Sequence, residues 1–180
     1  MQIHFTALLP HRDFRRILRD FRRRLFAAGL WGAYSFPELA PLALAARPWT
    51  REELGAAARF LRTQCGVFQS GGGRFSAFPP GGPLLWGPAL NLPPLPSPAG
   101  SVPLAAPVLC AALIPAAGGD AARAALDRAP PPPAFRFKAA ALVNVFWESL
   151  EQGAGACSFS WRIGRPCWLP APQEARHDGR

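Results

Sequence analysis

The feature that most constrains the fold is a short apolar run that leads into a helix with a strong start signal. Residues 42–46 form the run, whose length is typical of a strand covered on both faces or of a buried helical turn. Thr50 follows as a candidate N-cap, and Glu53 stands where its carboxylate can reach back to the Thr50 amide. Trp49 and Leu54 occupy hydrophobic-staple positions. Apolar residues then recur at helical spacing: Leu54, Ala57, Ala58 and Leu61.

The same order, an apolar run that closes on a proline before a polar cap and a helix, occurs at two further places. Residues 3–9 predict a first strand, and Asp13 is placed to cap a helix that Gly29 stops. Residues 108–114 predict a buried strand, and Asp120 opens an Ala-rich helix. The apolar face expected for the first helix is Phe14, Ile17, Leu18, Phe21 and Leu25.

The other segments predict strands, a turn and a long connection. Gly-rich residues 71–73 indicate a flexible turn, and Pro-rich residues 92–107 indicate an extended surface connection. Strands are predicted at residues 74–78 and 84–90, with P-P-G-G-P between them as the loop of a hairpin. Residues 135–148 predict a long strand or a bent pair, and residues 158–168 predict a final strand. This order of strands and helices predicts an α+β fold, with mixed or antiparallel sheets and helices packed on the outside. We expect one domain over residues 1–170 and a flexible tail over residues 171–180.

The balance of charge favours polyanionic partners. The chain has 20 basic and 11 acidic residues, and its net charge of +9 would attract RNA, DNA or an anionic membrane surface. A compositional preference for arginine without any binding role is the alternative. Residues 75–119 contain no charged side chain, but prolines divide them into pieces far shorter than the roughly 20 residues that cross a bilayer. We therefore expect no membrane span.

The four cysteines indicate neither a metal site nor a disulfide framework. Cys65, Cys110, Cys157 and Cys167 form no CxxC pair and have no histidine near them to complete a ligand set. The N-terminus lacks the basic region and the cleavage site of a secretory signal. We expect reduced thiols, a cytoplasmic protein, and neither a metal ion nor another cofactor.

Several short motifs together resemble those of the 2H phosphoesterase superfamily, the fold of the RNA 2′,3′-cyclic phosphodiesterases once called 2′-5′ RNA ligases. These motifs are P-x-x-L-A from Pro41, W-T-x-E-E-L from Trp49, F-x-x-F-P followed by L-L-W-G between Phe75 and Gly87, and F-R-F from Phe135. The resemblance covers most of the chain and implies a pseudo-twofold arrangement of two sheets around a groove.

Activity in that family requires two H-x-T/S motifs that face each other across the groove. One imidazole takes a proton and the other gives one, while the hydroxyls hold the phosphate. The aligned positions here are Leu42, Ala43 and Leu44 in the first half, and Lys138, Ala139 and Ala140 in the second. Because none of these side chains is a histidine or carries a hydroxyl, the resemblance implies a catalytically degenerate domain, and we lean against an enzyme.

The histidines that are present do not restore the motif. His4 and Thr6 spell H-x-T, but they lie on the first predicted strand, which carries no catalytic motif in the family. A structural hydrogen bond from a strand histidine is the better interpretation. His11 stands at a helix entry and His177 in the tail, where both are expected to be solvated.

Candidate binding residues are basic side chains that the resemblance would place along the groove. Arg136 and Lys138 alternate on one strand and so point to one side, where Arg162 of the last strand could join them as an anion pocket. Edge-strand charges that discourage aggregation are the alternative. The first helix offers a second basic row of Arg12, Arg16, Arg19 and Arg23, with a solvated face as its alternative. Trp86, Trp147, Trp161 and Trp168 would stack on bases or, more commonly, fill the core.

Three functions follow from these observations. The first is a degenerate 2H-like domain that binds RNA or a nucleotide in the vestigial groove. The second is a protein-interaction module that uses the uncharged, Pro-rich residues 75–119 as its contact surface. The third is an active cyclic-nucleotide or RNA phosphodiesterase with relocated catalytic groups. Binding that weakens steeply as salt rises would separate the first from the second.

Overall fold

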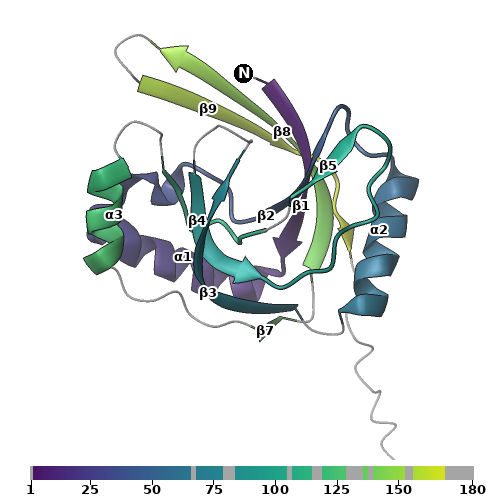
Figure 1. The fold of residues 1–180 in the computed structure, drawn as a ribbon, viewed down its shortest axis with the longest axis horizontal. Helices are drawn as coiled ribbons and strands as arrows, with labels where there is room; N and C mark the ends of the chain where they lie inside the picture. Colours follow the sequence, from purple (N-terminus) through teal and green to yellow (C-terminus); the bar gives the residue numbers. More distant parts are fainter. Residues whose placement is uncertain are drawn as a thin grey trace, which may run out of the picture.

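The computed structural model describes residues 2–65, 68–78, 84–104, 107–114, 119–128, 136–137, 140–152 and 156–168. Within them the chain has the predicted α+β class, with antiparallel sheets flanked by helices (Figure 1). The elements are β1 (Gln2–Pro10), α1 (Arg12–Ala27), η1 (Trp31–Tyr34), β2 (Ala40–Ala45), α2 (Arg51–Gln64), β3 (Phe68–Ala77), β4 (Leu84–Leu90), β5 (Ser101–Pro103), β6 (Ala112–Ile114), α3 (Gly119–Arg128), β7 (Arg136–Phe137), β8 (Ala140–Gln152), β9 (Ala156–Ile163) and β10 (Cys167–Trp168).

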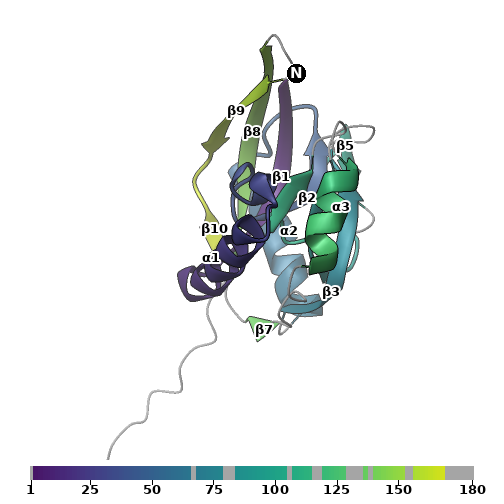
Figure 2. The same ribbon diagram turned by 90° about the vertical axis from the view of Figure 1, so that its left-hand side faces the viewer.

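The strands form two sheets, and each pairing between described strands is antiparallel. The larger sheet has the order β10-β8-β1-β2-β5, with β9 also paired to β8, and the smaller has the order β6-β4-β3-β7. The stretch predicted as a long strand or bent pair is divided between them, because β7 belongs to the smaller sheet and β8 to the larger. Helices α1 and α3 lie on one side of the strands and α2 on the other (Figures 1 and 2).

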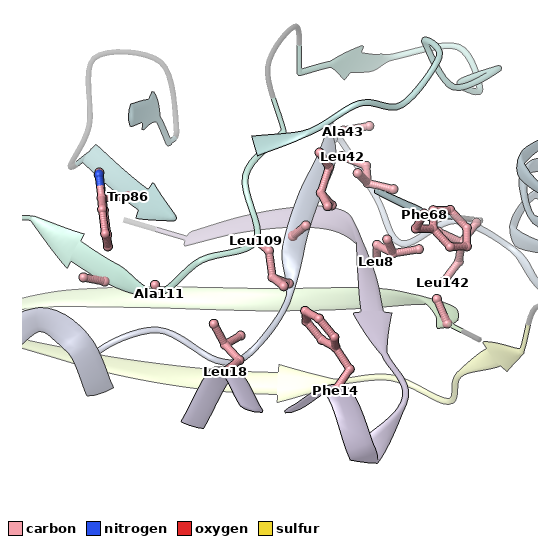
Figure 3. Close-up of a cluster of buried hydrophobic side chains, with 14 of the residues drawn as sticks. Leu8, Phe14, Leu18, Leu42, Ala43, Phe68, Trp86, Leu109, Ala111 and Leu142 are labelled. Carbon is pink, nitrogen blue, oxygen red and sulfur yellow. The ribbon is translucent and has the colours of Figure 1, made fainter. Parts of the chain in front are cut away.

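Alternation along β1 and β8 divides the core into two clusters. Phe5 and Val145 point to one side of the larger sheet and pack with residues of the smaller sheet such as Leu85. Leu8 and Leu142 belong to the other cluster, which also takes up the apolar stripes of α1 and α2 (Figure 3). The larger sheet is therefore buried on both faces over much of its area.

Helix α2 begins as the sequence predicts. The Thr50 hydroxyl accepts from the Glu53 amide at 3.2 Å, and the Glu53 carboxylate accepts from the Thr50 amide at 2.6 Å. Arg47 also binds this carboxylate at 2.7 Å. The Arg47 hydrogen bond and then the Thr50 amide lower the pKa of Glu53 to about 2. The buried residues of the helix are the predicted Leu54, Ala57, Ala58 and Leu61.

Helix α1 corrects two predictions made from the sequence. Its N-cap is His11 rather than Asp13, with no side-chain capping bond, because the helix already begins at Arg12. Ile17, expected on the apolar face, is 47% exposed, whereas Arg22 is only 3% exposed. The Arg22 guanidinium donates from Nη2 to the carbonyls of Phe36 (2.6 Å) and Cys110 (2.9 Å), so it links α1 to two connecting segments.

The end of α1 follows the prediction. Gly29 has a φ of 95°, the left-handed conformation that glycine adopts without a steric penalty. Its N–H donates to Phe26, and the Leu30 N–H donates to Leu25, which is the hydrogen-bond pattern of a Schellman motif. Leu25 and Leu30 are both buried and complete the stop with an apolar contact.

Two connections differ from their predictions. The glycines at residues 71–73 lie inside β3 rather than in a turn, next to an irregularity in the pairing between Ser70 and Gly73. An exposed position without close neighbours tolerates glycine in a strand, as at Gly72. The Pro-rich connection contains the short strand β5, which pairs with β2. The predicted hairpin of β3 and β4 is confirmed, and the tail at residues 171–180 lies outside the described residues.

Candidate functional site

The strand at the first motif position is interrupted at Leu42. Thr6 of β1 stands opposite Ala43, whereas the next residue, Ala7, stands opposite Pro41. Leu42 is thus the extra residue of a β-bulge and has no partner in β1. Bulges often re-aim a side chain near a functional site.

An apolar pocket of about 380 Å³ opens beside Leu42. The described residues that line it are all leucine or proline: Leu42, Leu92, Pro93, Pro94, Leu95, Pro103, Leu104 and Pro107. The Leu104 N–H donates to the Leu42 carbonyl at 2.8 Å, and the Leu90 N–H donates to the Pro107 carbonyl at 2.9 Å. These bonds hold the Pro-rich connection over the bulge, so that apolar side chains converge without any lining side chain that titrates.

The other motif positions are also occupied by aliphatic packing where the structure describes them. Leu44 stands opposite Phe5 and packs on the opposite core cluster from Leu42. Ala140 begins β8 and is fully buried. Lys138 and Ala139 lie outside the described residues. The described motif positions therefore offer nothing that could accept or donate a proton.

The basic residues proposed for an anion pocket lie on separate strands. Arg136 is on β7, opposite Gln69 of the smaller sheet. Arg162 is on β9, a strand that lies at the other end of the molecule from β7 in both views (Figures 1 and 2), and its guanidinium lies 5.1 Å from the ring centroid of Phe146. The structure therefore does not bring Arg136 and Arg162 together, and Arg162 faces an aromatic ring on the larger sheet instead.

The histidines are not arranged as an acid–base pair. The His4 ring lies 5.0 Å from the Phe146 ring near one end of β1. His11 follows the other end of that strand, with its ring 6.4 Å from Trp168. Neither lines the pocket, and His177 lies outside the described residues.

The arginines of α1 are partly engaged within the protein. Arg19 binds the Glu38 carboxylate through two nitrogens, at 2.9 and 3.2 Å. Arg23 contacts Asp20 at 3.3 Å, and Arg16 is exposed. The predicted row therefore has less free charge than its sequence indicates.

The thiols of Cys65 and Cys110 are ill suited to nucleophilic chemistry. Burial raises the pKa of the Cys110 thiol to about 12, even though the Arg22 guanidinium beside it acts in the opposite direction. Burial also raises the pKa of Cys65. Among the described residues, no three His, Cys, Asp or Glu side chains gather as a metal ligand set, and no helix is long and apolar enough to span a bilayer.

The tryptophans divide between the core and the surface. Trp86 and Trp147 are buried, Trp161 stacks on Trp147 at 5.5 Å, and Trp168 is 51% exposed. The pocket itself could not be identified from sequence, because its lining comes from segments up to 65 positions apart, Leu42 and Pro107. The uncharged, Pro-rich composition of residues 92–107 was the signal that pointed toward it.

Comparisons with protein-family models, with curated proteins and with solved structures found no match to this chain.

Proposed function

We propose that this protein is a catalytically inactive, 2H-phosphoesterase-like domain whose first motif position has become an apolar pocket for a protein partner. The observation that carries the proposal is the leucine and proline lining of the pocket at Leu42. The partner inserts one or two large apolar side chains there. Of the three functions that the sequence allows, this one is the interaction module built on residues 75–119.

The order of elements supports the scaffold. A strand leads through a proline into a helix at β1–α1, at β2–α2 and at β6–α3. The strands then divide into two antiparallel sheets with helices outside them, as a pseudo-twofold 2H fold requires. We propose in addition that the two sheets are related by a pseudo-twofold axis.

The chemistry of the lining disfavours a phosphate in the pocket. A phosphoryl group needs N–H or O–H donors, and moving an anion into an apolar site without them costs several kcal/mol, on the order of the penalty for a buried unpaired charge. Neither leucine nor proline has a side-chain donor, and the Leu104 N–H is already bonded to Leu42. RNA or a nucleotide in the vestigial groove therefore gains no support from these residues.

The surroundings of the pocket favour a protein over a small molecule. Small-molecule sites combine an apolar lining with a few polar groups that fix the orientation of the ligand, and this lining has no polar side chain. Outside the pocket the same connection stays uncharged, because residues 75–119 contain no charged side chain. An uncharged surface that extends past a single cavity suits side chains from an extended segment.

The partner is expected to dock by side chains and not by adding a strand. β5 forms an edge of the larger sheet, but the Ser101 N–H donates to Pro98 and Pro103 has no N–H. The Leu104 N–H points back to Leu42. This edge lacks the free donors that a new strand would need.

The test is a selection of short random displayed peptides on the full chain, followed by affinity measurement with matched variants. Pro94 lines the pocket and is exposed, whereas Pro96, two positions away, is exposed and does not line it. Selected peptides should carry a large apolar anchor and should bind Pro94→Asp about tenfold more weakly, because binding must desolvate the new carboxylate. Pro96→Asp should change the affinity less than about twofold.

Equal effects of the two substitutions, or a selection that yields no peptide with an apolar anchor, would overturn the proposal. Thermal melts of both variants show that the comparison is made between folded proteins. Turnover of a 2′,3′-cyclic nucleotide that is lost in His4→Ala would replace the proposal with the active phosphodiesterase.

A further inference from the structure

A row of side chains crosses the larger sheet, and none of them lines the pocket. Strand pairing places Arg162 of β9 opposite Phe146 of β8, Phe146 opposite His4 of β1, and His4 opposite Ala45 of β2. Residues directly opposite one another in antiparallel strands point to the same face. The row therefore presents an aromatic ring between a guanidinium and an imidazole.

The Phe146 ring contacts both of its neighbours in the row. The Arg162 guanidinium carbon lies 5.1 Å from the centroid of the Phe146 ring. The His4 ring centroid lies 5.0 Å from that of Phe146 at an interplanar angle of 48°. Arg162 is exposed and the rings of His4 and Phe146 are half-buried, so solvent reaches all three side chains.

Helix α2 leaves this part of the sheet uncovered. The Asn144 side chain accepts from the Trp49 N–H at 3.0 Å and donates to the Trp49 carbonyl at 2.7 Å. Asn144 is two positions from Phe146 on the same face of β8, so this pair of bonds sets the start of α2 just beyond the row. The free ends of β1, β8 and β9 extend past the helix in Figure 1.

These groups match the chemistry of an unpaired nucleic-acid base. Proteins that bind single strands stack bases on aromatic rings and on guanidinium planes carried by an open sheet, and they attract the backbone with positive charge. Here Phe146 supplies the ring, Arg162 supplies the guanidinium, and the net charge of +9 supplies the field.

One acidic residue stands beside the row. Glu148 is the next residue after Phe146 on the same face of β8, and its carboxylate accepts from Gln2 at 2.6 Å and from Ser160 at 3.5 Å. Its carboxylate would repel a phosphate placed directly over it. The backbone of a bound strand is therefore expected on the Arg162 side of the row.

We propose that the row His4–Phe146–Arg162 is a stacking site for single-stranded nucleic acid. No residue of the row lines the pocket at Leu42, and the site does not depend on the function proposed for that pocket.

The experiment measures binding of a short single-stranded RNA and of the matching DNA by fluorescence anisotropy over increasing potassium chloride. Phe146→Leu keeps an apolar side chain but removes the π face, and Arg162→Lys keeps the charge but removes the planar group. Arg165→Lys is the matched control, because Arg165 is an equally exposed arginine three positions away and outside the row. Melting curves confirm that each variant is folded.

We expect Phe146→Leu to weaken binding about tenfold, within the range measured for loss of a base-stacking aromatic. Arg162→Lys should weaken it about threefold to fivefold, and Arg165→Lys less than about twofold. Equal losses in the two arginine variants, an unaffected Phe146→Leu, or no binding at low salt would each overturn the proposal. Equal affinity for RNA and DNA would mean that the protein recognises the bases. A preference for RNA would mean that it also contacts the 2′-hydroxyl. Either result supports the site.

Discussion

The pocket at Leu42 and the row at Phe146 belong to the same sheet but arise in different ways. The row is fixed by strand register, since each of its members stands opposite the next on neighbouring antiparallel strands. The pocket arises where the Pro-rich connection crosses the bulge at Leu42, a residue that has no partner in β1. Regular pairing therefore yields a polar and aromatic surface, and its interruption yields an apolar hollow.

The largest expected effect tests whether both regions depend on one folded unit. Gly87 of β4 has no room for a side chain, because a Cβ there would lie 1.9 Å from the Leu109 carbonyl oxygen. Gly87→Ala should cost at least roughly 3 kcal/mol of stability and abolish both peptide and RNA binding. Gly72→Ala is the control, since a Cβ at Gly72 meets nothing within 4 Å. RNA binding that persists in Gly87→Ala would mean that the larger sheet folds by itself.

The next effect concerns Asn144, whose side chain joins β8 to the backbone of Trp49 just before α2. Asn144→Ala removes two hydrogen bonds to Trp49 and leaves its backbone groups without these partners. We expect a loss of about 2–3 kcal/mol in the free energy of unfolding, measured by urea titration. Gln2→Ala removes an exposed side-chain bond on the same face and should cost less than about 0.5 kcal/mol. Equal costs for the two variants would contradict a fastening role for Asn144.

A crossed test makes the comparison between the regions sharper. Pro94→Asp, at the pocket, should leave RNA affinity within about twofold of the original protein, because Pro94 is not part of the row and salt screens an exposed charge. Phe146→Leu should leave peptide affinity unchanged within the same limit. Peptide and RNA affinities are measured on the same preparations. If each substitution weakened both ligands, the regions would be one site.

The smallest effect lies at the start of α2. The pKa of Glu53 is about 2 in the folded protein, below the ordinary value of about 4.3 for a glutamate. A depressed folded pKa adds stability above the unfolded value, and this stability is lost as the pH falls through the folded value. The original protein should therefore exceed Glu53→Gln in urea midpoint at neutral pH, with the difference shrinking below about pH 4.3. A difference that stays constant down to pH about 2.5 would rule out the ionised carboxylate as its source.

Local signals predicted the parts of the fold that depend on neighbours in sequence. The capping box at Thr50 and the stop at Gly29 were recognisable because both are set by a few adjacent residues. Arg22 was not recognisable as a core residue, since its burial depends on carbonyls from Phe36 and Cys110, far away in the chain. Periodicity alone favoured Ile17, which the fold leaves exposed.

The candidate sites show the same division. The absence of histidine at Leu42 and Leu44 was visible in the sequence, but the cavity there was not. Arg162 was singled out as a binding residue together with Arg136, on the assumption that their strands share a groove. Sheet order decides this question: β7 and β9 lie in different sheets, and the partner of Arg162 is Phe146.

The side chain at position 42 can change without altering the pairing of β1 with β2. No residue of β1 stands across from it, so the hydrogen bonds on either side close whether the residue there is aliphatic or ionisable. A protein with such an unpaired position can lose a reaction through one substitution and still keep its shape. A surface at such a position can therefore change its partners while the strand pairing stays the same.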